Sequence, residues 1–230
     1  EVPQVSITFL EGWTFQQIRQ ALDDHPSVSH ATQGLADDEI LQRLKIKEAS
    51  PEGLFFPDTY HFGSGSSDLR VLRRAYSLMQ SRLQAQWAKR APNSPLATPY
   101  EGLILASIVE KETGREDERG LVAAVFINRL RKGMLLQADP TVIYGMGDAF
   151  DGNLRKRDLL TDTPYNTYVR RGLPPTPIAM PGRASLAAAL SEPESDALYF
   201  VSRGDGSSHF SRTLGEHERA VTKYQRSGRR

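Results

Sequence analysis

Two glutamates in one helical segment carry the first candidate chemistry of this sequence. Residues 101–114 form a dense apolar run without an internal proline, which is typical of a helix, and Gly114 is placed to cap its C-terminus. At about 100° per residue, Glu112 falls within the apolar arc of this helix, whereas Glu110 falls on the opposite side. We therefore expect Glu112 to point toward the core and Glu110 to point toward water.

A carboxyl group in apolar surroundings is expected to hold its proton tightly. Burial disfavours the charged form, and the C-terminal end of the helix dipole disfavours negative charge, so both effects raise the pKa of Glu112. A raised pKa is what a general acid needs near neutral pH. The helix alone leaves a second interpretation open, in which Glu112 is a structural residue paired with an arginine or exposed at a frayed helix end.

Composition excludes several classes of function. The chain has 230 residues and a formal net charge of +1, which argues against binding driven by the neutralisation of nucleic-acid phosphates. The absence of cysteine excludes disulfides, thiol catalysis and cysteine metal sites, and it fits an oxidising compartment. No apolar run approaches the roughly 18 residues that a membrane-spanning helix needs. Because the chain begins at Glu1 rather than at methionine, we interpret it as a fragment whose parent protein could carry an anchor.

The first part of the chain is predicted to be a small α/β subdomain. Alternating apolar residues predict a strand over 5–9, and Thr14 with Gln17 forms a capping-box pattern at the start of a helix. Two more helices are expected over 37–46 and from Asp68 to about residue 87. The proline-containing segment 91–99 is the clearest linker, so we place a boundary between an N-terminal subdomain, 1–95, and a second domain, 96–230.

The second domain is predicted to be mainly helical, with a hairpin near its end, so the fold class is α+β. Residues 116–131 form a mostly buried helix, and residues 142–144 begin a short β-like run. The proline-rich segment 164–181 either lines a sugar groove or wraps over the core as a connector. The remaining expected elements are a charged loop over 151–162, a helix over 185–190, hairpin strands over 198–203 and 208–212, and a final helix over 214–224.

Several blocks together resemble one family, the endolytic murein transglycosylases, which are also called MltG or YceG-like. The resemblance covers nearly the whole chain in order, and blocks of this length are far more specific than any single short motif. The blocks are ASIVEKET at 106–113, VFINRL at 125–130, LQADPTVIYG at 136–145, YNTY at 165–168, GLPP at 172–175 and LYFV at 198–201, with EG at 11–12 and FPDTY at 56–60 upstream.

The resemblance implies a protein anchored by one helix in the bacterial inner membrane, with a LysM-like module and a catalytic domain on its periplasmic face. The present chain would begin near the end of that module. The implied reaction is non-hydrolytic cleavage of the MurNAc-β-1,4-GlcNAc bond within nascent peptidoglycan strands, which leaves 1,6-anhydroMurNAc ends and terminates elongation. The family's catalytic residue is the second glutamate of its Glu-Lys-Glu-Thr motif, which is Glu112 here. The helical-face argument selects the same residue.

The expected partners are peptidoglycan glycan strands and, as candidates, peptidoglycan synthases, with no nucleic acid and no metal or nucleotide cofactor. Membrane contact is expected only through an anchor that lies outside this chain. The residues expected to orient substrate are Gln137, Asp139, Tyr144, Tyr165 and Asn166.

Two alternatives remain open at this point. One is a muramidase, in which water breaks the same bond and Asp139 is the second carboxylate. The other is a glycan-binding scaffold without activity, which a Glu112 that is exposed or paired with an arginine would favour.

Overall fold

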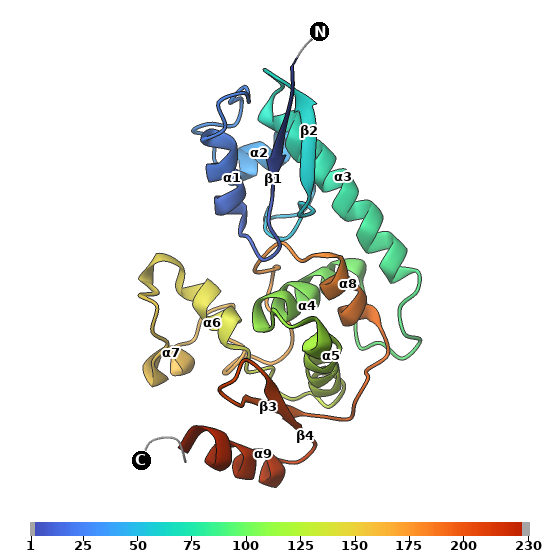
Figure 1. Cartoon of the computed structure of the whole chain (residues 1–230), viewed down its shortest axis with the longest axis vertical. Helices are drawn as coiled ribbons and strands as arrows, with labels where there is room; N and C mark the ends of the chain where they lie inside the picture. Colours follow the sequence, from blue (N-terminus) through green and yellow to red (C-terminus); the bar gives the residue numbers. More distant parts are fainter. Residues whose placement is uncertain (1–2, 227–230) are drawn as a thin grey trace.

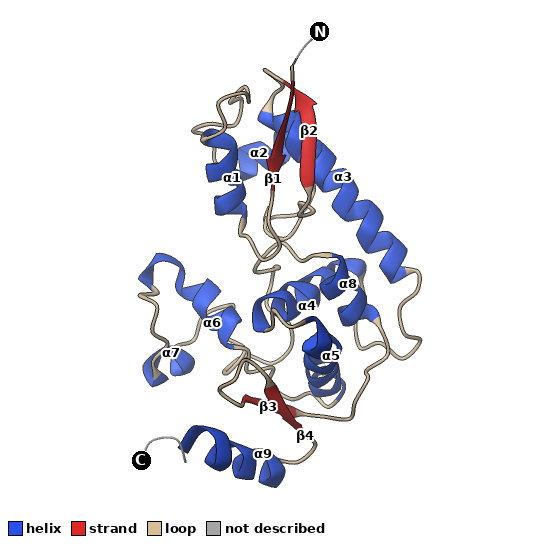
Figure 2. Cartoon of the chain, viewed as in Figure 1, coloured by secondary structure: helices blue, strands red, loops and turns tan. Residues whose placement is uncertain are grey.

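A computed structural model describes residues 3–226 of the chain. Figures 1 and 2 show two regions arranged along the long axis, with mixed strands and helices at the N-terminal end and mainly helices in the rest. The predicted α+β class is confirmed. The elements of the first region are β1 (Gln4–Thr8), α1 (Phe15–Asp23), α2 (Asp37–Leu44), β2 (Thr59–Gly63) and α3 (Asp68–Trp87). Those of the second are α4 (Pro99–Glu112), α5 (Glu116–Arg131), α6 (Asp139–Met146), α7 (Lys156–Leu160), α8 (Arg183–Leu190), β3 (Tyr199–Ser202), β4 (Ser208–Ser211) and α9 (Leu214–Val221).

The first region packs its helices against a two-stranded antiparallel sheet. Strands β1 and β2 pair in the register that sets Ile7 opposite Tyr60, and both of these side chains are buried. Helix α1 begins at the predicted capping box, in which Thr14 and Gln17 exchange side-chain and backbone hydrogen bonds. This reciprocal cap fixes the start of α1, a helix whose first turn also meets the second region.

Helix α4 lies at the centre of the second region. Its residues from Gly102 to Val109 are all buried, because α3, α5, α6 and α8 pack around it. A helix that is buried on every side needs apolar residues all round, which explains the dense apolar run in the sequence. Gly102 permits the close approach of α8, since a Cβ there would lie 2.9 Å from a methyl carbon of Leu190.

Four expectations about local structure are wrong. The charged loop predicted over 151–162 contains helix α7, Lys156–Leu160. Glu110 does not point toward water: its carboxylate accepts hydrogen bonds from the Gly182 N–H and the Ser185 hydroxyl, and so connects α4 to the start of α8. Helix α4 ends at Glu112 because Thr113 is extended, so Gly114 is not its cap. The β-like run over 142–144 belongs to helix α6. β-Branched residues there suggested a strand, but tertiary packing outweighs such a weak local preference.

The apolar core is continuous across the predicted boundary at residue 95. Met79 and Leu83 of α3 belong to the same buried cluster as Leu103 and Ile108 of α4. The boundary does fall in the segment between α3 and α4, and the division into two domains stays a prediction. Among the residues that the structure describes, no helix is long and apolar enough to cross a membrane.

The C-terminal elements form the predicted hairpin and a covering helix. Strands β3 and β4 pair antiparallel, with Phe200 opposite Phe210, and the connecting turn uses Gly204 and Gly206 at positive φ. Helix α9 contacts both strands, and a short π-helical turn, Thr222–Arg226, continues it. The hairpin thereby lies beside α5 and forms one wall of the cavity described below (Figure 1).

Gly53 holds the turn where the two regions meet, and its replacement is expected to be costly. It has φ +79°, and a Cβ there would lie 2.3 Å from the Pro177 Cβ. We expect Gly53→Ala to destabilise the protein by about 3 kcal/mol, through backbone strain and overpacking together. Gly34→Ala is the matched control because Gly34 has φ +76° and an added Cβ meets nothing within 4 Å. Urea denaturation should give a cost of about 1 kcal/mol for the control, and equal costs for the two variants would contradict this account.

Candidate active site

Glu112 is the last residue of α4, and its side chain lines a large cavity. The buried run 102–109 fixes the helix in the core, and the extended Thr113 turns the chain away immediately after Glu112. The carboxyl group is therefore carried by a rigid element and lies at the end of that element, in the cavity lining. This is the position that a catalytic group needs, because precision comes from the helix and access comes from the end of the helix.

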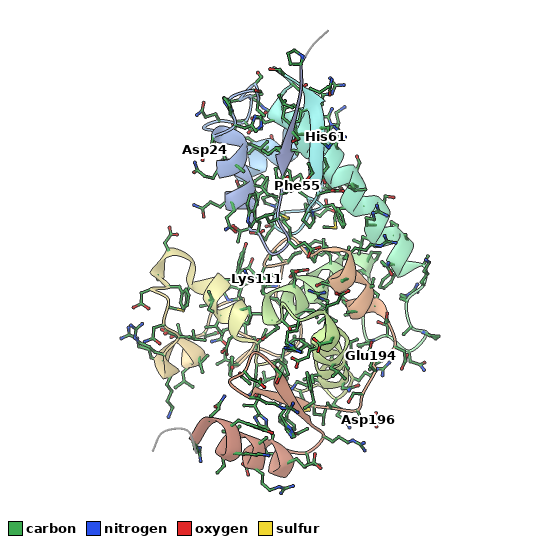
Figure 3. The ribbon with its side chains drawn as sticks, in the orientation of Figure 1. Asp24, Phe55, His61, Lys111, Glu194 and Asp196 are labelled. Atoms are coloured by element: carbon green, nitrogen blue, oxygen red, sulfur yellow. The ribbon has the colours of Figure 1, made fainter. Side chains whose placement is uncertain are left out.

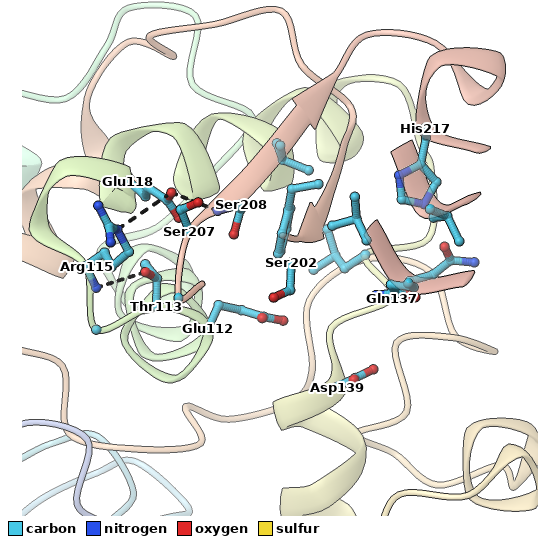
Figure 4. Close-up of a pocket in the computed structure, with 18 of the residues that line it drawn as sticks. Glu112, Thr113, Arg115, Glu118, Gln137, Asp139, Ser202, Ser207, Ser208 and His217 are labelled. Carbon is cyan, nitrogen blue, oxygen red and sulfur yellow. Dashed lines mark hydrogen bonds and ion pairs between the residues drawn. The ribbon is translucent and has the colours of Figure 1, made fainter. Parts of the chain in front are cut away.

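The cavity has a volume of about 580 Å³ and lies between the end of α4, α5, the start of α6 and the β3–β4 hairpin. Figure 4 shows Glu112 and Asp139 reaching from α4 and α6 into the same space, with Ser202 of the hairpin nearby. The residues of the cavity wall that matter here are Glu112, Gln137, Asp139, Arg129, Tyr168, Ser202, Ser208 and His217. Most residues of the whole lining have polar or charged side chains, although Val125, Leu136 and Phe200 also contribute, and this suits a ligand rich in hydroxyl and amide groups.

Glu112 has no hydrogen-bond or ion-pair partner within residues 3–226. Burial raises the pKa of Glu112 to about 8, and the nearby negative charge of Asp139 contributes to the increase. The carboxyl group is therefore protonated at neutral pH. The arginine pairing that would have made Glu112 a structural residue is absent from the described part of the chain.

Asp139 begins helix α6 and is held by a tyrosine. The position favours the carboxylate because the N-terminal end of a helix carries partial positive charge. The Tyr168 hydroxyl donates to Asp139 at 2.5 Å, and burial together with this carboxylate raises the pKa of Tyr168, so the hydroxyl keeps its proton. Tyr168 therefore holds the Asp139 side chain in place, where it reaches into the same cavity as Glu112.

Gln137 lies two residues before Asp139, in an unusual backbone conformation. Its φ is +52°, a region that residues other than glycine seldom adopt. The Gln137 N–H donates to the Thr167 carbonyl at 3.1 Å, and the Arg129 guanidinium donates to the Gln137 side-chain oxygen at 3.3 Å. Strained backbone of this kind clusters at functional sites when the surrounding contacts enforce it.

The cavity brings together three of the six residues selected from the sequence: Glu112, Gln137 and Asp139. The other three lie elsewhere. Tyr144 faces a different cavity and donates to Glu52, whereas Tyr165 packs on the Tyr144 ring and bonds Thr176. Asn166 is fully buried, and its amide donates to the carbonyls of Asp158, Leu159 and Thr161, which makes it a brace for the α7 segment. Substrate binding by these three residues stays a prediction, and the cavity around Glu112 gives it no support.

Sequence reasoning missed Tyr168, which donates to Asp139, and Arg129, which donates to Gln137. Tyr168 stands in the same YNTY block as Tyr165 and Asn166, but the block alone does not tell which of its side chains faces the cavity. Arg129 had only a weak signal: it follows the buried apolar run 121–127 closely, but Arg131 and Lys132 stand beside it in the sequence. The Arg129 guanidinium donates to the carbonyls of Leu198, Leu135 and Leu136. It thereby connects α5 to the residue before β3 and to the segment that precedes Asp139.

The raised pKa of Glu112 predicts a pH-dependent stability difference for Glu112→Gln. Between pH 4.5 and about 8 the folded native chain keeps a proton that the unfolded chain releases, so native stability falls as pH rises through this window. Glutamine does not titrate. We expect Glu112→Gln to have nearly native stability at pH 4 and to gain up to about 5 kcal/mol relative to the native chain above pH 8, since each unit of pKa shift corresponds to about 1.4 kcal/mol. Thermal unfolding across this range measures it, and a difference that does not grow with pH would contradict the assignment.

A protonated carboxyl group beside a second carboxylate, in an open polar cavity, is the arrangement typical of enzymes that cleave glycosidic bonds. Comparison with known proteins agrees with this class. The sequence model of the YceG-like family matches residues 1–223, and the chain belongs to that family.

Two curated relatives bear the same name. The chain is 35% identical over 235 residues to the endolytic murein transglycosylase of Bacillus subtilis, covering 95% of this chain and 64% of that protein. It is 28% identical to the endolytic murein transglycosylase of Streptococcus pneumoniae, covering 98% of this chain and 42% of that protein. The chain therefore spans less than two thirds of the length of either relative.

A solved structure is also similar. The crystal structure of a YceG-like protein from Listeria monocytogenes superposes with a TM-score of 0.73 at 29% identity, covering 95% of this chain and 76% of that one. With 95% of this chain covered, the match extends over both regions of the fold.

Proposed function

We propose that this chain carries the activity of an endolytic lytic transglycosylase, which cleaves the MurNAc-β-1,4-GlcNAc bond within nascent peptidoglycan strands and leaves 1,6-anhydroMurNAc ends. Glu112 carries this proposal: its carboxyl group has no partner among the described residues, has a pKa raised to about 8, and lines a polar cavity that also holds Asp139. The printed names of the two curated relatives support the same activity.

In the first step, Glu112 donates its proton to the glycosidic oxygen. The bond between that oxygen and C1 of MurNAc breaks, the GlcNAc-containing part leaves as an alcohol, and positive charge develops at C1 and the ring oxygen. The 2-acetamido group of the substrate stabilises this charge. The raised pKa of Glu112 supports this step because an ordinary glutamate would already have lost its proton at pH 7.

In the second step, the Glu112 carboxylate removes the proton from the C6 hydroxyl of the same MurNAc, and the C6 oxygen attacks C1. The ring closes to the 1,6-anhydro sugar, Glu112 regains its proton, and no water is consumed. Asp139 assists both steps, since its negative charge favours protonated Glu112 at the start and makes the carboxylate a stronger base afterwards. Gln137 and Tyr168 hold the cavity wall and Asp139 in place.

A muramidase is the second candidate, and one observation favours it. Asp139 lies on the wall of the Glu112 cavity, where a second carboxylate could activate water. The transglycosylase mechanism also accounts for the hydrogen bond from Tyr168 to Asp139 and for the effect of the Asp139 charge on the pKa of Glu112. We therefore rank hydrolysis second. An inactive scaffold ranks third because Glu112 has no arginine partner in the described residues.

The proposed setting is the one that the family resemblance implies. Nascent strands are the substrate, peptidoglycan synthases are candidate partners, and the protein would act at the periplasmic face of the inner membrane, held by an anchor outside this chain.

Strands labelled at one end distinguish internal from terminal cleavage. Un-crosslinked glycan strands are incubated with the protein, and the labelled products are sized at early times. An endolytic enzyme gives labelled fragments of many lengths from the start, whereas release of one disaccharide at a time would contradict the proposed mode of attack.

A further inference from the structure

A second cavity lies on the other side of the α4 terminus from the Glu112 cavity. It has a volume of about 620 Å³ and is bounded by the first turn of α1, the turn that holds Glu52, and helix α6. We call it the Glu52 pocket. The residues used below are Gln16, Asp37, Glu52, Lys111, Tyr144 and Asp148, all of which line it.

The two cavities adjoin each other at two places in the chain, the end of α4 and the start of α6. Lys111 lines the Glu52 pocket and the next residue, Glu112, lines the other cavity, while Asp139 and Pro140 are divided between the cavities in the same way. The end of α4 and the start of α6 therefore separate the two cavities. Figure 3 shows Lys111 at the junction between the two regions of the molecule. A chain-like ligand that passes over Glu112 has a cavity available on each side.

The Glu52 pocket is a built polar site. Glu52 is only 5% exposed, and its two oxygens accept hydrogen bonds from the Phe15 N–H at 2.8 Å and the Tyr144 hydroxyl at 2.9 Å. Burial raises the pKa of Glu52 to about 7, which reflects the free energy cost of holding this carboxyl group there. A carboxylate offers about four acceptor positions, so capacity remains for a ligand hydroxyl.

The charges around the pocket select against an anionic ligand. The carboxyl groups of Glu52 and Asp148 line it without an ion-pair partner among the described residues, whereas that of Asp37 is paired with Arg19 at 3.0 Å. The ammonium group in the lining is that of Lys111, whose Nζ also donates to the Gly12 carbonyl at 3.3 Å. Carboxylates accept hydrogen bonds from hydroxyl groups and repel other carboxylates. The apolar side chains of Ile143 and Pro140 complete the wall, which suits the mixed faces of a neutral sugar ring.

We propose that the Glu52 pocket is a second saccharide subsite, which binds a neutral N-acetylglucosamine unit of the same strand whose MurNAc lies at Glu112. This rests on the proposed function, because it assumes a glycan strand as the ligand. An enzyme that cuts within a strand must hold sugars on both sides of the scissile bond, and the Glu52 pocket supplies the side opposite the β3–β4 hairpin.

The test uses peptide-free glycan strands and the whole chain carrying Glu112→Gln, so that binding is measured without cleavage. In this background Gln16→Trp fills the pocket from its exposed wall on α1. Gln20→Trp is the matched control, since Gln20 lies one turn further along the same helix and does not line the pocket. Calorimetry with the glycan strands should show that Gln16→Trp raises the dissociation constant about tenfold, which corresponds to about 1.4 kcal/mol. The control should raise it less than about twofold. Equal thermal stability of the two variants excludes an effect on folding.

Each outcome bears on the subsite separately from the reaction. Unchanged affinity in Gln16→Trp would overturn the subsite, and so would an absence of strand binding to any variant. If the native chain gives anhydro ends in either case, the proposed function stands and only the subsite fails. If Gln16→Trp alone weakens binding while the native chain gives reducing ends or no cleavage, the subsite stands and the proposed reaction fails.

Discussion

Replacing Glu112 by glutamine is expected to lower the cleavage rate about 10³- to 10⁴-fold, because one residue acts both as the acid and as the base. Glutamine fills the same space at the end of α4 but has no proton to donate to the glycosidic oxygen. Binding of strands should be retained, since Glu112 makes no hydrogen bond that holds the described fold together. The rate of appearance of new strand ends from un-crosslinked glycan measures the effect.

Glu110→Gln is the matched control for this experiment. Glu110 belongs to the same helix and the same motif, but its carboxylate bonds Gly182 and Ser185 of the α8 segment. Its replacement is expected to cost about 1 kcal/mol of stability and to leave the rate within about threefold of native. A Glu112→Gln protein that cleaves at a similar rate to Glu110→Gln would remove Glu112 from the mechanism.

The second large effect is expected for Asp139→Asn, whose cleavage rate at alkaline pH should fall below that of the native protein. Native activity should fall as pH rises through about 8, where Glu112 loses its proton. Removal of the Asp139 charge lowers the pKa of Glu112, so the alkaline limb of the pH profile moves to lower pH. At pH 8 we expect the variant to be about five- to tenfold slower than the native protein, since each unit of pKa is a factor of ten in the protonated fraction.

A surface carboxylate provides the control for this shift. Asp151 is exposed and paired with Arg155 at 2.6 Å, so Asp151→Asn changes the net charge equally without facing Glu112. Its pH profile should match that of the native protein. An alkaline limb that stays in place in Asp139→Asn would contradict the coupling between the two carboxyl groups. Complete loss of activity at every pH would instead favour Asp139 as the base of a muramidase.

Local sequence patterns predicted the elements that position the site. The apolar run before Glu112 placed a rigid helix there, the Thr14 capping box set the start of α1, and the glycine turn set the C-terminal hairpin. These features depend on neighbours within a few residues. They are the features that a single sequence can report.

Long-range contacts decided what the sequence did not predict. Helix α4 is buried on all sides, so its apolar arc gave no reliable direction for Glu110, which bonds α8 instead of water. The same limit hid Glu52, whose carboxyl group meets Tyr144 from a segment 92 residues away. Asn166 was selected for its chemistry, but its amide satisfies three backbone carbonyls of the α7 segment. A side chain with a suitable functional group is available for substrate only if the fold does not already use it.

The most direct test of the central claim is cleavage of un-crosslinked strands in heavy-oxygen water, with mass spectrometry of the new ends. If Glu112 removes the proton from the C6 hydroxyl and water takes no part, the native chain gives anhydro ends that contain no heavy oxygen. The Glu112→Gln variant should then give almost no new ends. New reducing ends that carry heavy oxygen would contradict the transglycosylase mechanism and would make water, activated at Asp139, the acceptor.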